Sequence, residues 1–256
     1  MTAGPDRASR PCRGCPVPQG LGNYAPVITR SKILASLGLE RHRELLEITR
    51  PSFERYAGRH GYELAIPSVD PAPERTHKQW AKIALVRQLL AACDVLVWVD
   101  SDVVVVDHTA DIADALDPSP RRFLGLVEHH YDGQHVPNTG VMVIRSTRSS
   151  RRFFDLVWAK TQYLETRWHD NAAVLELLGY EFDPEASPMY CRPRQPTRWR
   201  RQTQFLDIAW NSVPCHMAAI PRIVHVTGAT PWDERRELLL RAAAVACGDQ
   251  PTHPRA

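Results

Sequence analysis

The chain has 256 residues, of which 43% are hydrophobic and 24% charged, and its formal net charge is +3. These values are typical of a soluble globular protein, and one large domain fits this length better than two small ones. So small a net charge gives no reason to expect nucleic acid or an acidic membrane as a partner. No apolar run approaches the roughly 20 residues of a membrane-spanning helix.

The N-terminal segment offers little that a core could bury. Residues 1–25 are rich in Pro, Gly and Arg, so we expect a disordered tail there. The segment lacks the apolar core of a secretory signal, which favours a cytoplasmic location. Cys12 and Cys15 form a Cys-x-x-Cys pair without two further clustered ligands, so we expect free thiols rather than a zinc site. One domain is expected over residues 26–248, followed by a short tail over 249–256.

The first part of the domain alternates apolar strands with amphipathic helices. We expect strands at residues 33–37 and 62–66 and helices at residues 40–59 and 80–92. Pro51 should kink or divide the first of these helices, and Gly61 should end it. This order predicts an α/β fold with a doubly wound, mostly parallel sheet, in which ligands bind beyond the carboxyl ends of the strands.

The most informative stretch is Val95–Val106, an apolar and mostly β-branched run that contains Asp100 and Asp102. We expect one strand, buried on both faces, with both carboxylates on the same side because side chains alternate along a strand. Adjacent carboxylates repel each other and need a compensating partner, for which Mg²⁺ or Mn²⁺ is the natural choice. The alternative, a solvated strand end, is less favoured because the apolar run continues past the pair.

Three functions remain compatible with this pair. The first is the metal site of a nucleotide-sugar glycosyltransferase. The second is a phosphohydrolase with Asp100 as nucleophile and Asp102 as acid. Against the second, no further pair of metal-binding acids follows residue 146, and two strand–helix units precede the motif. The third is a non-catalytic protein that binds nucleotide sugars.

The rest of the chain continues the α/β pattern. We expect a short helix at 111–116, strands at 123–127, 141–144 and 222–226, a polar loop at 129–137, helices at 149–166, 168–178 and 230–247, and an irregular segment at 183–204. Five arginines lie between Arg192 and Arg201 in the irregular segment, which is too short and Pro-broken to favour nucleic-acid binding. An acceptor-side loop or a solvated face is the preferred interpretation.

Six stretches, in order, resemble a known enzyme family. They are residues 80–82, 97–102, 137–141, 168–172, 209–211 and 223–228. Together they span roughly residues 31–240 and resemble the galactosyl-, mannosyl- and xylosyltransferase family, which includes fungal α-galactosyl- and mannosyltransferases and plant xyloglucan xylosyltransferases. The chain looks most like the bacterial members of that family.

The resemblance implies a single Rossmann-like GT-A domain, a divalent metal (Mn²⁺, or else Mg²⁺) and transfer from a nucleotide sugar, with UDP as the expected nucleotide and with retention of configuration. Asp100 and Asp102 match the family's Asp-x-Asp motif, and His225 matches a late histidine that acts as a further metal ligand. Asp170 stands where the family often has an acid facing the sugar, which makes it the catalytic candidate; Asn171 stands where it often has Gln.

Donor contacts are expected from Gly38, Trp80, Lys82, Asp100, Asn138, Gly140 and Gly228. Four of these residues have a plainer alternative: Lys82 on a solvated helix face, Trp80 in the core, and Asn138-Thr-Gly140 as an ordinary turn. For Asp170 the alternative is simple stabilisation by the N-terminus of a helix. The sequence leaves the sugar open among galactose, xylose, glucose and mannose. The acceptor is a glycan, a lipid-linked intermediate or a small molecule.

Overall fold

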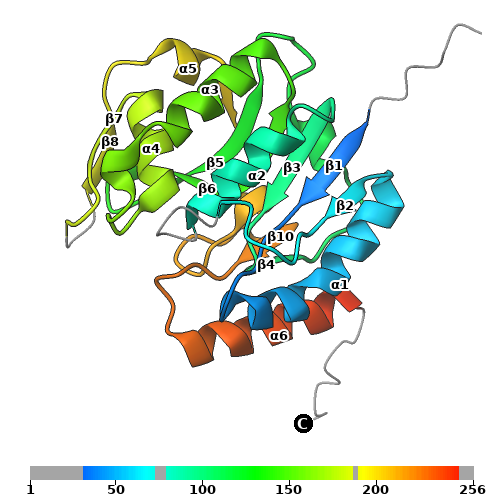
Figure 1. Cartoon of the computed structure of the whole chain (residues 1–256). Coiled ribbons are helices and arrows are strands. Elements are labelled where there is room, and N and C mark those ends of the chain that lie inside the picture. Colours follow the sequence, from blue (N-terminus) through cyan, green and yellow to red (C-terminus); the bar gives the residue numbers. More distant parts are fainter. Residues whose placement is uncertain (1–30, 73–78, 187–189, 248–256) are drawn as a thin grey trace, which may run out of the picture.

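A six-stranded sheet with helices on both faces forms the centre of the protein (Figure 1). The computed structural model describes residues 31–72, 79–186 and 190–247. Its strands are β1 Lys32–Ala35, β2 Glu63–Ala65, β3 Val95–Val99, β4 Val103–Val105, β5 Leu124–Tyr131, β6 Gln134–Arg145, β7 Tyr180–Asp183, β8 Tyr190–Pro193, β9 Thr203–Phe205 and β10 Ile223–His225. Its α-helices are α1 His42–His60, α2 Gln79–Leu89, α3 Arg148–Trp158, α4 His169–Leu178, α5 Arg198–Arg201 and α6 Trp232–Cys247. The 3₁₀ helices are η1 Ile112–Ala115, η2 Thr161–Tyr163 and η3 Ile208–Asn211.

The sheet is mostly parallel, as the sequence predicts. Its strand order is β2-β1-β3-β6-β5-β9. Strand β1 pairs in parallel with β2 and β3, and β5 pairs in parallel with β9. Only β6 runs against both of its neighbours, β3 and β5. Five of the six strands therefore point the same way, and their carboxyl ends meet at one edge of the sheet.

Both faces of the sheet are buried, and the side chains of β3 alternate between them. Leu96 and Trp98 pack into the core below α2, α3 and α4, together with Trp80 of α2. Val97 and Val99 pack into the opposite core, formed with α1. This two-sided burial explains why β3 is an uninterrupted apolar run. Helix α6 lies beside α1 and covers β4 (Figure 1).

Helix α1 is one element of 19 residues with Pro51 inside it, so the expected division did not occur. Pro51 and Glu47, whose carbonyl loses its intrahelical partner, both lie on the exposed side, where water can bond that carbonyl. Gly61 ends the helix as predicted, with φ 68° and its N–H donating to the Ala57 carbonyl. That left-handed conformation is one that glycine adopts without strain.

The expectation of one strand through Val95–Val106 was wrong. The chain leaves the main sheet after Val99, and Val103–Val105 pairs with β10 in a separate two-stranded antiparallel sheet. Asp100 and Asp102 therefore lie in the turn between two strands, and the period-two argument does not apply to them. Periodicity in the sequence could not reveal the break, because both halves are buried and apolar.

The polar loop expected at 129–137 and the turn expected at Asn138–Gly140 were also wrong. Strands β5 and β6 continue through both segments and form a hairpin, whose turn residues Asp132 and Gly133 have φ of 50° and 70°. An Asp-Gly pair with positive φ at both positions is typical of a type I′ turn. In the β5–β6 pairing, Val127 is opposite Asn138 whereas Leu126 is opposite Met142, so residues 139–141 form a bulge.

Two further segments differ from the sequence expectation. The helix expected over 149–166 ends at Trp158 and is followed by η2. The irregular segment expected at 183–204 contains β8, α5 and β9, of which β9 is an edge strand of the main sheet. These elements are only three or four residues long, which is too short for a hydrophobic period to show. The expected N-terminal tail, with Cys12 and Cys15, lies outside the described residues.

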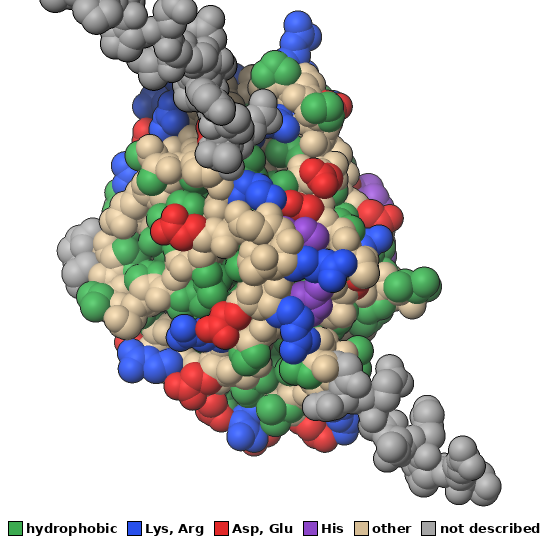
Figure 2. Space-filling view, turned by 90° about the vertical axis from the view of Figure 1, so that its right-hand side faces the viewer, with side chains coloured by type: hydrophobic (Ala, Val, Ile, Leu, Met, Phe, Trp, Pro, Cys, Tyr) green, Lys and Arg blue, Asp and Glu red, His purple; other side chains and the backbone are tan. Residues whose placement is uncertain are grey.

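The surface carries both signs of charge. On the face shown in Figure 2, Lys and Arg side chains are interspersed with Asp and Glu, without an extended area of one sign. This agrees with the small net charge. Among the described residues, no helix combines the length and the apolar character that crossing a bilayer requires.

Candidate functional site

A cavity of about 550 Å³ opens beyond the carboxyl end of β3. Its walls include five of the residues that the sequence singled out, namely Lys82, Asp100, Asp102, Asp170 and Gly228. They come from α2, the β3–β4 turn, the first turn of α4 and the segment after β10. This is the edge where the parallel strands end, which is where an α/β fold binds ligands.

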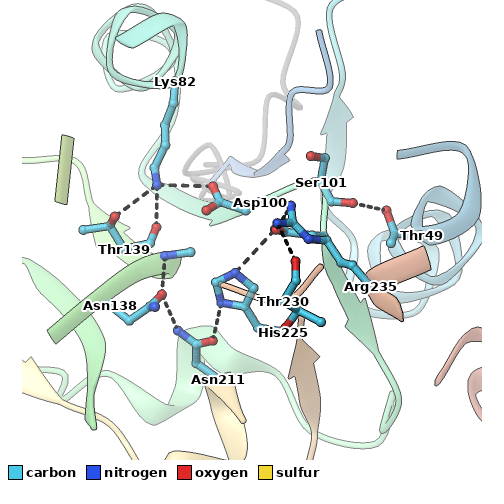
Figure 3. A network of polar contacts seen from close by, with 12 residues as sticks. Thr49, Lys82, Asp100, Ser101, Asn138, Thr139, Asn211, His225, Thr230 and Arg235 are labelled. Carbon is cyan, nitrogen blue, oxygen red and sulfur yellow. Dashed lines mark hydrogen bonds and ion pairs between the residues drawn. The ribbon is translucent and has the colours of Figure 1, made fainter. Parts of the chain in front are cut away.

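The turn that carries the two carboxylates is fixed by bonds from distant segments. The Asp100 N–H donates to the Gly140 carbonyl at 2.8 Å, and the Val226 N–H donates to the Asp102 carbonyl at 3.0 Å. Between them, the Ser101 carbonyl accepts a bond from the Thr49 hydroxyl of α1 at 3.1 Å (Figure 3). Three elements thus hold three consecutive residues, which keeps both carboxylates in place without a ligand.

The predicted metal ligands come together. One ligand atom each from Asp100, Asp102 and His225 lies within 4.8 Å of the others. His225 Nε2 is 3.4 Å from Asp102 Oδ1, and both residues are buried, with 4% and 8% of their surface exposed. The pairing of β4 with β10 creates this proximity, because His225 lies directly opposite Val103.

A relay of hydrogen bonds sets the orientation of the His225 ring (Figure 3). The Gly140 N–H donates to Asn138 Oδ1 at 2.8 Å, which identifies that atom as an acceptor. Asn211 Nδ2 donates to the same oxygen at 3.0 Å, so Asn211 Oδ1 is left to face His225 Nδ1, 3.0 Å away. In neutral His225 the proton must then sit on Nδ1. Nε2 faces the Asp102 carboxylate.

Gly140 leaves room for this ring. A Cβ at Gly140 would lie 2.2 Å from His225 Cε1 and 2.6 Å from Nδ1, closer than any real contact. The sequence assigned Asn138 and Gly140 to the donor. In the structure, Asn138 instead accepts a hydrogen bond from Asn211, and Gly140 makes room for His225. Contact with the donor therefore remains a prediction for both residues.

Lys82 lies at the centre of the second half of the site. Its ammonium is 3.2 Å from Asp100 Oδ1 and 3.1 Å from Asp170 Oδ2, and it donates to the carbonyl of Thr139 at 2.8 Å. Burial lowers the pKa of Lys82, but Asp100 and Asp170 outweigh it, so the pKa is raised and the side chain stays charged. The alternative of a solvated helix face is wrong, because Lys82 is only 6% exposed.

Asp170 lies in the first turn of α4, where the helix dipole favours a carboxylate. Its Oδ2 also accepts a bond from the Thr139 hydroxyl at 3.1 Å. The adjacent Asn171 accepts a bond from the Thr139 N–H at 3.1 Å, which ties α4 to the bulge of β6. Thr139 therefore positions Lys82, Asp170 and the helix that carries Asp170, although the sequence analysis assigned it no role of its own.

The two carboxylates of the turn differ in their proton affinity. Burial raises the pKa of Asp100, and neighbouring Asp102 adds to this against the opposing charge of Lys82, so the pKa lies above its usual range. Burial also raises the pKa of Asp102, but His225 and Arg235 outweigh it and hold that pKa below its usual range. The charge of Asp102 is thus already balanced by its neighbours, whereas Asp100 holds its charge less easily and would gain from a cation beside it.

Arg235 and His42 belong to the site but escaped the sequence analysis. Arg235 Nη1 is 3.5 Å from Asp102 Oδ2, and the residue is buried with 6% of its surface exposed. One feature of the sequence could have identified Arg235 as a site residue. It lies near the N-terminus of α6, where the helix dipole disfavours a positive charge unless another interaction compensates. His42, at the start of α1, also lines the cavity, and burial lowers its pKa.

Like Asn138 and Gly140, two further residues expected to contact the donor, Trp80 and Gly38, do not line the cavity. Trp80 is completely buried and packs edge-to-face against Trp158, with 6.2 Å between ring centroids. The alternative of a core residue therefore describes Trp80, and stacking on the donor finds no support. Gly38 allows the chain to pass close to α1, since a Cβ there would be 2.7 Å from the His42 carbonyl oxygen. Its neighbours Leu37 and Leu39 line the cavity.

The donor set fits a divalent cation that prefers oxygen. Asp100 and Asp102 can supply carboxylate oxygens, and His225 can supply Nε2, because Asn211 holds the ring through its other nitrogen. Mn²⁺ and Mg²⁺ accept such ligands and complete their coordination with water or phosphate oxygens.

No protein-family model and no curated protein sequence matches the chain. Membership of the family that the sequence resembles is therefore not confirmed. Among solved structures, the chain is similar to a glycosyltransferase involved in the glycosylation of the major capsid of PBCV-1, with a TM-score of 0.60 and 18% identity over 82% of this chain and 98% of that one. It is also similar to the bifunctional glycosyltransferase WbbM, with a TM-score of 0.52 and 12% identity over 86% of this chain.

The chain spans only 50% of the WbbM chain, so the likeness covers one part of that protein. At these identities the likeness establishes the fold. The chain has the GT-A glycosyltransferase fold, and the fold class predicted from the sequence is confirmed.

Proposed function

We propose that this chain is a metal-dependent glycosyltransferase that moves a hexose or pentose from a nucleotide sugar to a hydroxyl acceptor, with retention of configuration. One observation carries the proposal: ligand atoms of Asp100, Asp102 and His225 lie within 4.8 Å of one another, beside a cavity that Asp100, Asp102, Lys82 and Asp170 line, in a GT-A fold. UDP is the proposed nucleotide, on the strength of the family resemblance alone. The acceptor is a glycan, a lipid-linked intermediate or a small molecule.

The chemistry to be catalysed is the departure of a nucleoside diphosphate from an anomeric carbon. Negative charge builds on the diphosphate as the bond breaks, and fixed positive groups in a dry site stabilise that charge. Mn²⁺ or Mg²⁺, bound by Asp100, Asp102 and His225, would supply Lewis-acid chemistry at the diphosphate. Lys82 contributes an ammonium that is already in place, because Asp170 and Thr139 hold it next to Asp100.

Asp170 is the proposed catalytic carboxylate. Its Oδ2 faces Lys82 and Thr139, which leaves Oδ1 as the oxygen to approach the sugar. In that position it would hydrogen-bond the donor sugar or stabilise positive charge at the anomeric carbon. A covalent glycosyl-enzyme and a front-face transfer both retain configuration, and trapping of a sugar on Asp170 separates the two.

The test is release of nucleotide from UDP- and GDP-sugars without acceptor, with and without Mn²⁺. We expect slow, Mn²⁺-dependent release from one donor by the wild type, and its loss in Asp102→Ala. The matched control is Asp155→Ala, which removes a half-exposed carboxylate paired with Arg87 outside the site. No release, together with no thermal stabilisation by any nucleotide plus Mn²⁺, contradicts the proposal.

The same assay separates the alternatives. A phosphohydrolase would cleave simple phosphate monoesters and would lose that activity in Asp100→Asn. A non-catalytic binding protein would bind a nucleotide sugar with Mn²⁺ without releasing the nucleotide. The cytoplasmic location expected from the sequence also remains a prediction.

A further inference from the structure

A second group of metal-binding side chains lies near the tip of the β5–β6 hairpin. Its members are Glu128 and His130 of β5 and His135 of β6, and one ligand atom of each lies within 4.8 Å of the others. His130 is directly opposite His135 in the hairpin, and Glu128 precedes His130 by two residues, so all three side chains share one face. Glu128 Oε2 is 2.7 Å from His130 Nε2 and 3.3 Å from His135 Nδ1.

Two neighbouring residues hold the carboxylate of Glu128 through its oxygen Oε1. The Glu128 side chain is only 9% exposed, its Oε1 accepts a bond from the hydroxyl of Tyr180, and Arg200 Nη2 lies 3.6 Å from the same oxygen. The second oxygen, Oε2, is thereby turned towards the two imidazoles.

We propose that Glu128, His130 and His135 form a second metal site, selective for Zn²⁺ or a similar transition-metal ion. Two imidazole nitrogens and one carboxylate oxygen are a donor set of zinc sites, whereas Mg²⁺ and Mn²⁺ prefer oxygen ligands. Ligands about 2.0–2.1 Å from a tetrahedral ion are about 3.3 Å apart. The 3.3 Å from Glu128 to His135 matches that spacing, whereas the 2.7 Å from Glu128 to His130 is a hydrogen-bond length, so the exposed His130 ring has to move outward to admit the ion.

The surroundings also match what a metal ligand needs. Carboxylates that bind metals are themselves hydrogen-bonded through an outer shell, which is the role of Tyr180 here. The side chains of His130 and His135 are 57% and 38% exposed, so the rings can adjust and water can take a fourth position. The charge of Arg200 opposes a cation, so we expect weaker affinity than in a closed zinc site.

The location gives such a metal a structural consequence. It would link β5 to β6 three residues before Asn138, the residue that begins the relay to His225. Binding would therefore stiffen the strand that positions the site in the cavity. The inference itself does not depend on the proposed enzymatic function, because the three ligands are distinct from those of the cavity.

The experiment uses the full-length chain carrying Asp102→Ala, which disables the first site. After metal removal, Zn²⁺ is titrated by calorimetry, and Co²⁺ binding is followed by its visible absorption. We expect one equivalent of Zn²⁺ and an increase in melting temperature. Adding His135→Ala should weaken binding by about 100-fold or more, since loss of an outer-shell partner alone costs about 10–100-fold. His60→Ala, which changes a histidine on α1, should bind as the parent does.

Three outcomes would overturn the proposal. They are the absence of zinc binding by the Asp102→Ala chain, binding that survives His135→Ala, and binding that is lost equally in His60→Ala. Circular dichroism of each variant shows whether it is folded. His130→Gln, at the more exposed ligand, provides a second test that does not depend on the folding of His135→Ala.

Discussion

Replacement of Asn211 by leucine tests whether the relay behind His225 prepares a metal site. Asn211 is completely buried and makes two hydrogen bonds, one from its Nδ2 to Asn138 Oδ1 and one between its Oδ1 and His225 Nδ1, both 3.0 Å long. Leucine has a similar volume but cannot accept the hydrogen bond that the Nδ1–H of His225 donates. Asn138 Oδ1 keeps its bond from the Gly140 N–H, so the perturbation falls mainly on His225.

The magnitude follows from the two bonds. A buried donor left without a partner costs about 1–3 kcal/mol, which sets the expected loss of unfolding free energy. Loss of an outer-shell partner of a metal-binding histidine weakens metal affinity by about 10–100-fold, or about 1.4–2.7 kcal/mol. We therefore expect Asn211→Leu to fold, to be less stable, and to bind Mn²⁺ at least about tenfold more weakly than the wild type.

Mn²⁺ binding is measured by titration with detection of free Mn²⁺ by electron paramagnetic resonance, and stability by urea unfolding. The matched control is Thr147→Ala, which removes the N-cap of α3 and costs about 0.5–2 kcal/mol of stability. That variant should bind Mn²⁺ like the wild type. An Mn²⁺ affinity within twofold of the wild type in Asn211→Leu, or an equal loss in Thr147→Ala, would refute the reasoning.

Three further predictions concern charges inside the protein. Lys82→Met leaves Asp100 and Asp170 without their shared cation, so unfolding free energy should fall by about 3–5 kcal/mol. Mn²⁺ should then raise the melting temperature of this variant more than that of the wild type. An equal rise in both proteins would contradict the role of Lys82 as the cation that both carboxylates share. Burial, and then the charge of neighbouring His216, lowers the pKa of His129 to about 3. Between that value and an unfolded pKa of about 6.5, only the unfolded chain binds the proton. The free energy of unfolding should therefore fall with falling pH by up to about 1.4 kcal/mol per pH unit. In His129→Phe, urea unfolding at several pH values should show a smaller change of unfolding free energy per pH unit. Asp170→Asn should keep donor binding, measured by calorimetry, but lose most transfer, and unchanged turnover would remove Asp170 from the mechanism.

The sequence by itself determined the main framework. The apolar run of β3, the helix α2 and Gly61 as a helix end were all predicted and are present. Each is a local feature, because burial on one or two faces imposes a period and a left-handed end favours glycine. The Asp-x-Asp pair also stood out, since charged groups in an apolar run need a special reason, and the family resemblance pointed to His225.

Only the tertiary structure decided how these residues meet. The break after β3 arises because Val103–Val105 pairs with β10, some 120 positions away, and this pairing brings His225 to the carboxylates. The bonds of the site join residues 57, 73 and 133 positions apart, as in Lys82 to Thr139, Asn211 to Asn138 and Arg235 to Asp102. A hydrophobic period reports which face of a segment is buried, but not which distant segment covers it. Partner choice is a property of the packed chain, so the relay behind His225 could only be seen in the fold.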